Sequence, residues 1–308
     1  MWPRLVFKML AVAGVADLEV RAQHQARGEA PVQAKGTLKV ASLNLQGFDQ
    51  DGSRLKAIAA QVVAELGGPN GTPDVFVLQE AMALGDSSTA HRLADELRAL
   101  GVLYHVTFKE RKNREGDYPE GLAILSKRPI PAEDIRSLDL SSPTREEIGG
   151  ARWWPRVALS ADFEVPGLGR VRVVNTHHES NAAGIETRRR QVGEVQDWIA
   201  KQQAERPAQI TVLGGDFNPD VSALDFRRRE FSGLTQPAQQ GHLRFIDANR
   251  EGGTWKDPER GAFTQRLDYV FVNEVPGVQH RGERLIHLQK NGKDLTDHLL
   301  LVQDFAWY

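Results

Sequence analysis

The sequence predicts an α/β or α+β fold, and three observations support this prediction. Short apolar segments with strand-like patterns recur along the chain, and segments with apolar residues at helical spacing lie between them. This β-rich alternation with interspersed helices is typical of the two mixed fold classes. No linker-like segment divides residues 37–308, so we expect a single domain there, preceded by a leader or disordered linker over residues 1–36.

Each predicted element follows from its local pattern. Residues 38–44 alternate like a strand, and Ser53 can cap a helix in which Leu55, Ile58 and Val62 recur at helical spacing. We predict strands over residues 38–44, 74–80, 103–109, 121–126, 156–163, 170–176, 209–214, 267–272 and 299–305, and helices over residues 53–66, 88–100, 185–203 and 221–231.

Composition excludes several classes of site. The chain has 39 Lys and Arg against 41 Asp and Glu, so no global basic field attracts it to nucleic acid or to an anionic membrane. A local basic groove remains compatible with this balance. The chain has no cysteine, which excludes disulfides, thiol nucleophiles and cysteine-ligated metal sites.

The first residues leave two localisations open. Arg4 and Lys8 precede the short apolar run 9–16, which ends in the small-x-small pattern Gly14-Val15-Ala16 and resembles a signal peptide. The run is short and interrupted, so a cytoplasmic and an exported protein are both compatible with it. A membrane-spanning helix needs ~20 apolar residues, and the chain has no such run.

Polar residues recur where the apolar segments begin or end. Glu80 and His177 each end one such segment, Asp216 and Asn218 follow another, and the pair 297–298 (Asp-His) precedes a fourth. Any one of them could be a simple strand-end cap, but their shared placement favours a preorganised site. Carboxylates and amides suit a hard cation such as Mg²⁺, and histidines beside carboxylates suit proton transfer. These are the groups that water attack on a phosphate ester requires.

Short motifs in the same order resemble the endonuclease/exonuclease/phosphatase superfamily. They are Val40-Ala41-Ser42-Leu43-Asn44, Leu78-Gln79-Glu80, Gly121 to Ser126, Asn175-Thr176-His177, Gly215-Asp216-Phe217-Asn218, Arg266-Leu267-Asp268-Tyr269-Val270 and Thr296-Asp297-His298. The resemblance covers residues 37–305, and Gly-Asp-Phe-Asn followed by Asp-His is its most specific part. It implies an α/β sandwich of two packed mixed β-sheets flanked by helices, and so a catalytic domain over residues 37–308.

The resemblance also implies roles for individual residues. Glu80 would be the principal metal ligand, Asn44 would help to position the metal or the phosphate, and Asp297 would be a further metal or water-network group. Mg²⁺ is the expected ion, and Mn²⁺ or Ca²⁺ could substitute or assist.

The remaining roles concern the attacking water and the phosphate. Asp216 would orient or deprotonate the water, and Asn218 would hold the phosphate or the nucleophile. Asp268 would pair with His298 and fix its tautomer. His177 would stabilise the phosphorane oxygens or help the leaving group.

Tyr118-x-Glu120 is similar to a segment of the deoxyribonuclease-like members, in which the acid pairs with the first catalytic histidine. We therefore expect Glu120 to pair with His177. Side chains alternate along an extended chain, so His178 should face away from the site or contact substrate only.

The substrate is less well determined by the motifs. Met82 stands where nucleases often carry an arginine, whereas Arg152, the Trp153-Trp154 pair and Trp255 are candidates for contact with substrate. The arginine triplets 188–190 and 227–229 could be solvated faces or phosphate contacts. Solvated faces are the simpler interpretation.

We expect a monomeric Mg²⁺-dependent phosphoesterase that hydrolyses phosphodiester bonds, with nucleic acid as the leading substrate. A phosphomonoesterase and a sphingomyelinase-type phospholipid phosphodiesterase are alternatives on the same site. An inert scaffold on a degenerate form of the fold is disfavoured, because every motif residue is present.

Overall fold

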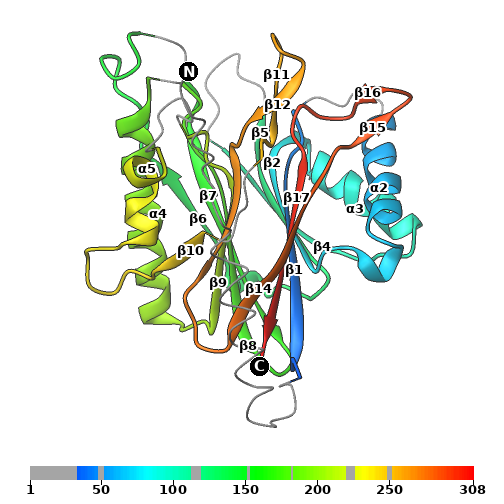
Figure 1. Cartoon of the computed structure of the whole chain (residues 1–308), viewed down its shortest axis with the longest axis horizontal. Helices are drawn as coiled ribbons and strands as arrows, with labels where there is room; N and C mark the ends of the chain where they lie inside the picture. The colour runs from blue at the N-terminus through cyan, green and yellow to red at the C-terminus, as the bar shows by residue number, and fades with distance from the viewer. Residues whose placement is uncertain are drawn as a thin grey trace, which may run out of the picture.

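The computed structural model describes residues 33–47, 52–111, 119–150, 153–181, 183–219, 226–247 and 252–308. Two β-sheets pack face to face in the middle of the molecule (Figure 1). Helices α2 (Ser53–Glu65) and α3 (Thr89–Ala99) cover one outer face, and α4 (Ile185–Glu205) and α5 (Phe226–Thr235) cover the other. The predicted sandwich of two mixed sheets flanked by helices is confirmed.

The first sheet has the strand order β14-β17-β1-β2-β5-β4, and the short β3 (Ser87–Ser88) extends it beside β2. Strands β1 and β2 are parallel, and the other pairs are antiparallel. The bounds are β1 (Gly36–Asn44), β2 (Val75–Leu84), β4 (His105–Glu110), β5 (Glu120–Ser126), β14 (Val278–Ile286) and β17 (Leu300–Trp307).

The second sheet repeats this plan, with the order β10-β13-β9-β8-β7-β6 and one parallel pair, β8 and β9. The bounds are β6 (Ile135–Leu140), β7 (Arg156–Val165), β8 (Gly169–His177), β9 (Ile210–Asp216), β10 (Phe245–Asp247) and β13 (Asp268–Asn273). In each sheet a helix connects the parallel strands, α2 between β1 and β2 and α4 between β8 and β9, because a parallel pair needs a long crossover.

Two hairpins and two 3₁₀ turns complete the described elements. They are β11 (Trp255–Asp257) with β12 (Ala262–Gln265), β15 (Gln289–Lys290) with β16 (Lys293–Asp294), η1 (Pro69–Gly71) and η2 (Ala132–Asp134).

The core has three layers, as expected for helices packed outside a sandwich. Val40, Val77, Val173 and Val212 lie in the layer between the sheets. The layer under α2 and α3 contains Leu55, Ile58, Val62, Leu93 and Leu97, and the layer under α4 and α5 contains Val192, Val195, Ile199, Phe231 and Leu234. No described helix is long and apolar enough to cross a membrane.

The helix predicted over residues 221–231 is present over its described part, in α5. Its first part lies outside the described residues, and α5 extends to Thr235. The predicted start of α3 is one residue early, since Ser88 is the N-cap and its hydroxyl accepts a hydrogen bond from the His91 amide.

Candidate active site

The predicted site residues meet at one edge of the sandwich, where the parallel strands of both sheets end. Asn44 and Glu80 belong to β1 and β2, and His177 and Asp216 to β8 and β9. Asp268 begins β13 and lies in register with Asp216, which in turn lies in register with His177. Because in-register residues share a face of a sheet, these three side chains form one row. His177 and Asp216 border a cavity of about 610 Å³, whose lining also includes Glu80, Arg111, Glu120, Trp154, Arg156, Asn218, Trp255, Asp297 and His298.

Glu80 faces this cavity because the strand is irregular there. The register of β2 against β5 shifts between Leu78 and Ala81, and Glu80 has a φ of 52°. A bulge of this kind redirects a side chain, and a non-glycine residue at positive φ is strained. Loss of hydration, with the nearby Glu120 carboxylate, raises the pKa of Glu80 to about 7.

Asn44 joins the two halves of the site. Its Nδ2 donates to Glu80 Oε1 at 2.9 Å and to Asp216 Oδ2 at 3.1 Å, while its Oδ1 accepts from the Gln46 amide at 2.8 Å. The Gln46 contact fixes which end of the amide faces the carboxylates. Asn44, predicted beside the metal, therefore acts in this structure as a donor that orients two carboxylates.

Asp216 is buried and surrounded by donors. Its Oδ2 lies 3.7 Å from His177 Nε2 and 3.8 Å from His298 Nε2, and its Oδ1 accepts from the Asn218 amide at 3.1 Å. Burial, reinforced by the neighbouring Asp268, raises the pKa of Asp216 to about 6. Asn218 has a φ of 46°, and its Nδ2 donates to the His178 carbonyl at 3.3 Å, so the turn after β9 is held in a strained conformation.

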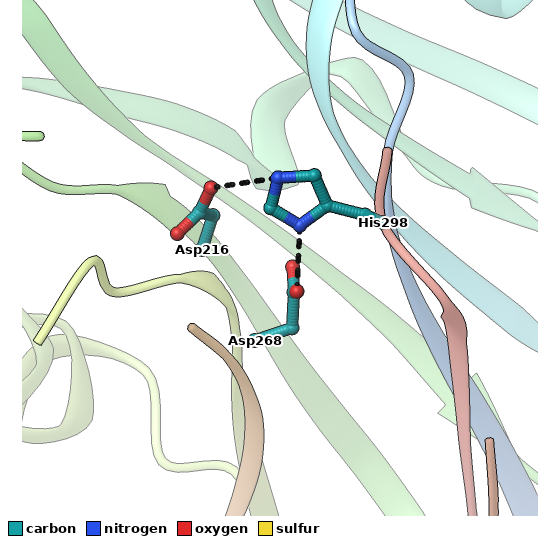
Figure 2. Close-up of side chains that lie close together, drawn as sticks. All are labelled: Asp216, Asp268 and His298. Carbon is teal, nitrogen blue, oxygen red and sulfur yellow. Dashed lines mark hydrogen bonds and ion pairs between the residues drawn. The ribbon is translucent and has the colours of Figure 1, made fainter. Parts of the chain in front are cut away.

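Asp268 and His298 lie together, as the sequence analysis expects. Asp268 Oδ2 is 2.7 Å from His298 Nδ1, and the opposite ring nitrogen points toward Asp216 (Figure 2). Burial alone would lower the pKa of His298, but the carboxylates of Asp268, Asp216 and Asp297 outweigh it and raise the pKa to about 10. His298 is therefore an imidazolium at neutral pH.

His177 and His178 differ as predicted for neighbours on an extended strand. His177 borders the cavity, whereas His178 packs edge-on against Phe217 with ring centroids 4.9 Å apart. Burial, with the nearby Arg156 and His298, lowers the pKa of His177 well below its usual value, and burial with Arg188 and Arg156 lowers the pKa of His178 to about 3. Both rings are neutral at neutral pH.

The predicted pairing of Glu120 with His177 is wrong for the described part of the chain. Glu120 Oε1 instead lies 2.9 Å from Arg111 Nη2, and the Arg111 amide donates to the Glu120 carbonyl at 3.1 Å. A permanently charged guanidinium on the adjacent strand end is a stronger partner for a carboxylate than a neutral imidazole. Glu120 still borders the cavity.

Asp297 and Trp255 also line the cavity and contact each other. Trp255 Nε1 donates to Asp297 Oδ2 at 3.3 Å, and Asp297 Oδ1 has no hydrogen-bond partner among the described residues. Trp255 thus lies beside the cavity, as expected for a substrate contact, and it also orients a candidate metal ligand.

Two predicted site residues, Tyr118 and Arg152, lie outside the described residues, as do the side chains of the triplet 227–229. In the other triplet, Arg188 is buried against Glu230, and Arg189 and Arg190 pair with Glu186 and Glu147. All three arginines therefore form ion pairs within the protein. The prediction that the triplet is a solvated face is wrong for Arg188, which is buried.

The cavity also contains two arginines that the sequence analysis did not select, Arg111 and Arg156. Arg156 is the first residue of β7, and its Nη2 donates to Ser180 Oγ at 3.0 Å. The sequence signal that could have identified Arg156 is its position as a charged residue at the start of a predicted strand. Arg111 follows β4 and had no comparable signal in its local sequence.

Two groups of residues could hold a metal ion. Ligand atoms of Asp216, Asp268 and His298 all lie within 4.8 Å of one another. However, an imidazolium has no lone pair to offer a metal, which weighs against this group. Glu80 and Asp297 offer carboxylate oxygens to the same cavity. These oxygen donors fit a hard divalent ion.

Solved structures share the fold. An endonuclease/exonuclease/phosphatase from Beutenbergia cavernae DSM 12333 has a TM-score of 0.58 and 23% identity, with 89% of this chain and 72% of that chain covered. A family protein from Bacteroides thetaiotaomicron has a TM-score of 0.62 and 19% identity over 90% and 100% of the chains. Truncated Caenorhabditis elegans TDP2 has a TM-score of 0.60 and 20% identity over 88% and 98%.

None of the curated proteins matches the sequence. The sequence does match the profile of the Endonuclease/Exonuclease/phosphatase family over residues 41–298, which is most of the chain and contains every motif residue from Asn44 to His298. The chain therefore belongs to the endonuclease/exonuclease/phosphatase family, whose members hydrolyse phosphoester bonds.

Proposed function

We propose that this phosphoester hydrolase is a Mg²⁺-dependent phosphodiesterase acting on nucleic acid. The observation that carries the proposal is that Glu80, Asp216 and His298 line one cavity and are linked behind it by Asn44 and Asp268. Asp216 supplies a buried base, His298 supplies a positive charge held in place by Asp268, and Glu80 supplies oxygen ligands.

Glu80 and Asp297 would hold the ion, with Asn44 orienting Glu80. A bound Mg²⁺ would neutralise charge on the phosphate and polarise its oxygens. The pair of half-buried carboxylates suits Mg²⁺, which is bound in proteins by one or two carboxylates and retains several waters.

Asp216 would orient and deprotonate the attacking water. Its Oδ1 is occupied by the Asn218 amide, and its Oδ2 faces the side of the cavity where His177 and His298 lie. A pKa of about 6 leaves the carboxylate ionised at neutral pH, yet basic enough to accept a proton in the transition state.

The two histidines have different charges and so different tasks. The His298 imidazolium, fixed by Asp268, would stabilise the negative charge that develops on the phosphoryl oxygens. The neutral His177 would hydrogen-bond a phosphoryl oxygen on the other side of Asp216.

Nucleic acid is favoured as substrate by the walls of the cavity. Trp154 and Trp255 can stack on bases, a contact worth ~1–3 kcal/mol per base. Arg156 supplies a positive charge that no carboxylate of the described residues pairs with at ion-pair distance. Such a local charge does not require a basic protein surface.

The test measures hydrolysis of supercoiled plasmid, bis(p-nitrophenyl) phosphate and p-nitrophenyl phosphate, with Mg²⁺ and with EDTA. We expect plasmid nicking and diester hydrolysis that need Mg²⁺ and that fall by ~100-fold or more in His298→Ala. His105→Ala, on the outer strand β4, is the matched control and should keep full activity.

Each substrate separates one alternative. Cleavage of the monoester alone would replace the proposal by a phosphomonoesterase, and cleavage of the small diester without plasmid would favour a phospholipid or other small diester. Equal rates in EDTA would refute metal dependence, and full activity in His298→Ala would refute the site.

A further inference from the structure

Arg54, in the first turn of α2, connects two segments that are far apart in the sequence. Its Nη1 donates to the Leu45 carbonyl at 2.5 Å and to the Leu295 carbonyl at 2.9 Å, across 241 positions of sequence. Its Nη2 makes a longer contact of 3.5 Å with the Gly47 carbonyl. One guanidinium thus holds the loop after β1 against the segment that leads to Asp297 and His298.

These two segments carry most of the residues on the proposed metal side of the cavity. Asn44 and Gln46 belong to the first, and Asp297 and His298 to the second. Two further contacts cross the same junction: Thr296 Oγ1 donates to the Asn44 carbonyl at 2.8 Å, and the Asp297 amide donates to Gln46 Oε1 at 3.2 Å. The position of Asp297 relative to Asn44 is therefore determined at this junction.

The loop after β1 needs such support because its backbone is strained. Gln46 and Gly47 are consecutive residues at positive φ, 50° and 57°, and only the second is a glycine. Strain of this kind persists only where surrounding contacts outweigh it. The Gln46 amide also fixes the Asn44 side chain, so a relaxed loop would release the donor that orients Glu80 and Asp216.

We infer that Arg54 is a positioning residue. It sets the distance between two parts of the site, Asn44 and Glu80 on one side and the pair 297–298 (Asp-His) on the other. Through this distance it determines the affinity of the site for its divalent cation. This inference rests on the proposed metal dependence. A lysine would replace the arginine only in part, because an ammonium lacks the planar fork that spans several carbonyls in fixed directions.

The experiment compares wild type with Arg54→Met, Arg54→Lys and the control Arg98→Met. Arg98 is an exposed arginine on the neighbouring helix α3 that pairs with Asp95. The readouts are the Kd for Mn²⁺, from the electron paramagnetic resonance signal of the free ion, the kcat and KM for bis(p-nitrophenyl) phosphate, and the melting temperature in EDTA.

We expect Arg54→Met to weaken Mn²⁺ binding by ~10- to 100-fold, as is usual when a residue supporting metal ligands is lost. At a fixed Mg²⁺ concentration, the kcat of Arg54→Met for the diester should fall because less of the enzyme holds the ion. Its KM should change less than about twofold, since no substrate contact is removed. Arg54→Lys should lie between Arg54→Met and wild type, and Arg98→Met should match wild type.

A Kd for Mn²⁺ that is unchanged in both Arg54 variants would overturn the inference, even if the melting temperature fell. If Arg54→Met does not fold, Arg54→Lys decides by the same criterion. Failure of the proposed function looks different, because wild type itself would then bind no Mn²⁺ and hydrolyse the diester equally in EDTA.

Discussion

The side chain of Glu80 illustrates how a functional residue can oppose stability. Its backbone is at positive φ, and its carboxylate lies near those of Glu120 and Asp216 with one hydrogen-bond donor among the described residues, the amide of Asn44. Such an arrangement is costly until a cation balances the charge.

We therefore predict opposite effects of Glu80→Gln on stability and activity. Removing the half-buried charge should raise the melting temperature in EDTA at pH 8 by a few degrees, because a neutral amide costs less than a carboxylate in this position. Hydrolysis with Mg²⁺ should fall by ~100-fold or more. Calorimetry and a diester assay on the same samples check both effects, and a lower melting temperature would contradict the account of the charge.

Asp268 permits a second test, of the charge on His298. In Asp268→Asn, the carboxylate that most raises the pKa of His298 is removed, while the side-chain shape is kept. The pKa of the imidazole should then fall, and kcat should fall by ~100-fold or more with little change in fold. The ring carbon and nitrogen NMR shifts of His298 report its charge directly. A still-protonated ring at pH 8 would show that Asp216 and Asp297 suffice.

Much of the site could be predicted from single residues, because strand-end polar residues keep their place whatever the details of packing. Glu80, His177, Asp216 and His298 all came from this pattern, and all meet at one cavity. Which side chains contact each other was harder to predict from the sequence. Glu120 pairs with Arg111, and Asn44 takes its orientation from Gln46, because both contacts depend on loop geometry that no local pattern encodes.

At the scale of elements, the strands that the sequence analysis missed include the edges of the two sheets. β14 is the outer strand of the first sheet and β6 that of the second. The sequence of β14, VQHRGERLI, is largely polar, and none of its residues is fully buried. Edge strands commonly carry charged residues that discourage aggregation, and these residues erase the apolar alternation by which buried strands are recognised.

Helices α4 and α5 are joined by a buried ion pair that also supports the site. Arg188 Nε donates to Glu230 Oε2 at 2.6 Å, and Arg188 Nη1 donates to the carbonyls of Glu179 and Asn181, in the loop that follows His177. Arg188 therefore fixes this loop from the helix side.

Arg188→Met should lower the free energy of unfolding by ~3–5 kcal/mol, because it breaks the ion pair between two buried side chains by removing one partner. The double variant Arg188→Met/Glu230→Met should recover part of the loss, whereas Arg189→Met, at an exposed pair, should change little. Urea unfolding of the four proteins measures this. A double variant as unstable as the single one would show that the contacts to the loop carbonyls, not the charge, dominate.

At the scale of the whole molecule, a polar bridge crosses the otherwise apolar layer between the sheets close to the site. Asn175 on β8 donates from Nδ2 to the carbonyls of Leu78 at 2.8 Å and Ala123 at 2.9 Å, and its Oδ1 accepts from Gln79 Nε2 at 2.8 Å. Asn175 and Gln79 are both fully buried. In the sequence, Gln79 is adjacent to Glu80, and Asn175 lies two positions before His177. The bridge between them therefore sets the separation of the two sheets where they share the cavity.

This position predicts that stability and catalysis can be separated. Asn175→Leu should lower the free energy of unfolding by ~2–4 kcal/mol, since it leaves Gln79 and two carbonyls without their partner. Adding Gln79→Leu removes one unsatisfied group and should restore part of that stability, because apolar side chains suit the layer between the sheets. The kcat should stay low in the double variant, because the polar contact between the strand that carries Glu80 and the strand that carries His177 is still absent. Urea unfolding and diester hydrolysis test this together, and recovery of kcat along with stability would show that packing alone, without the polar bridge, aligns the two halves of the site.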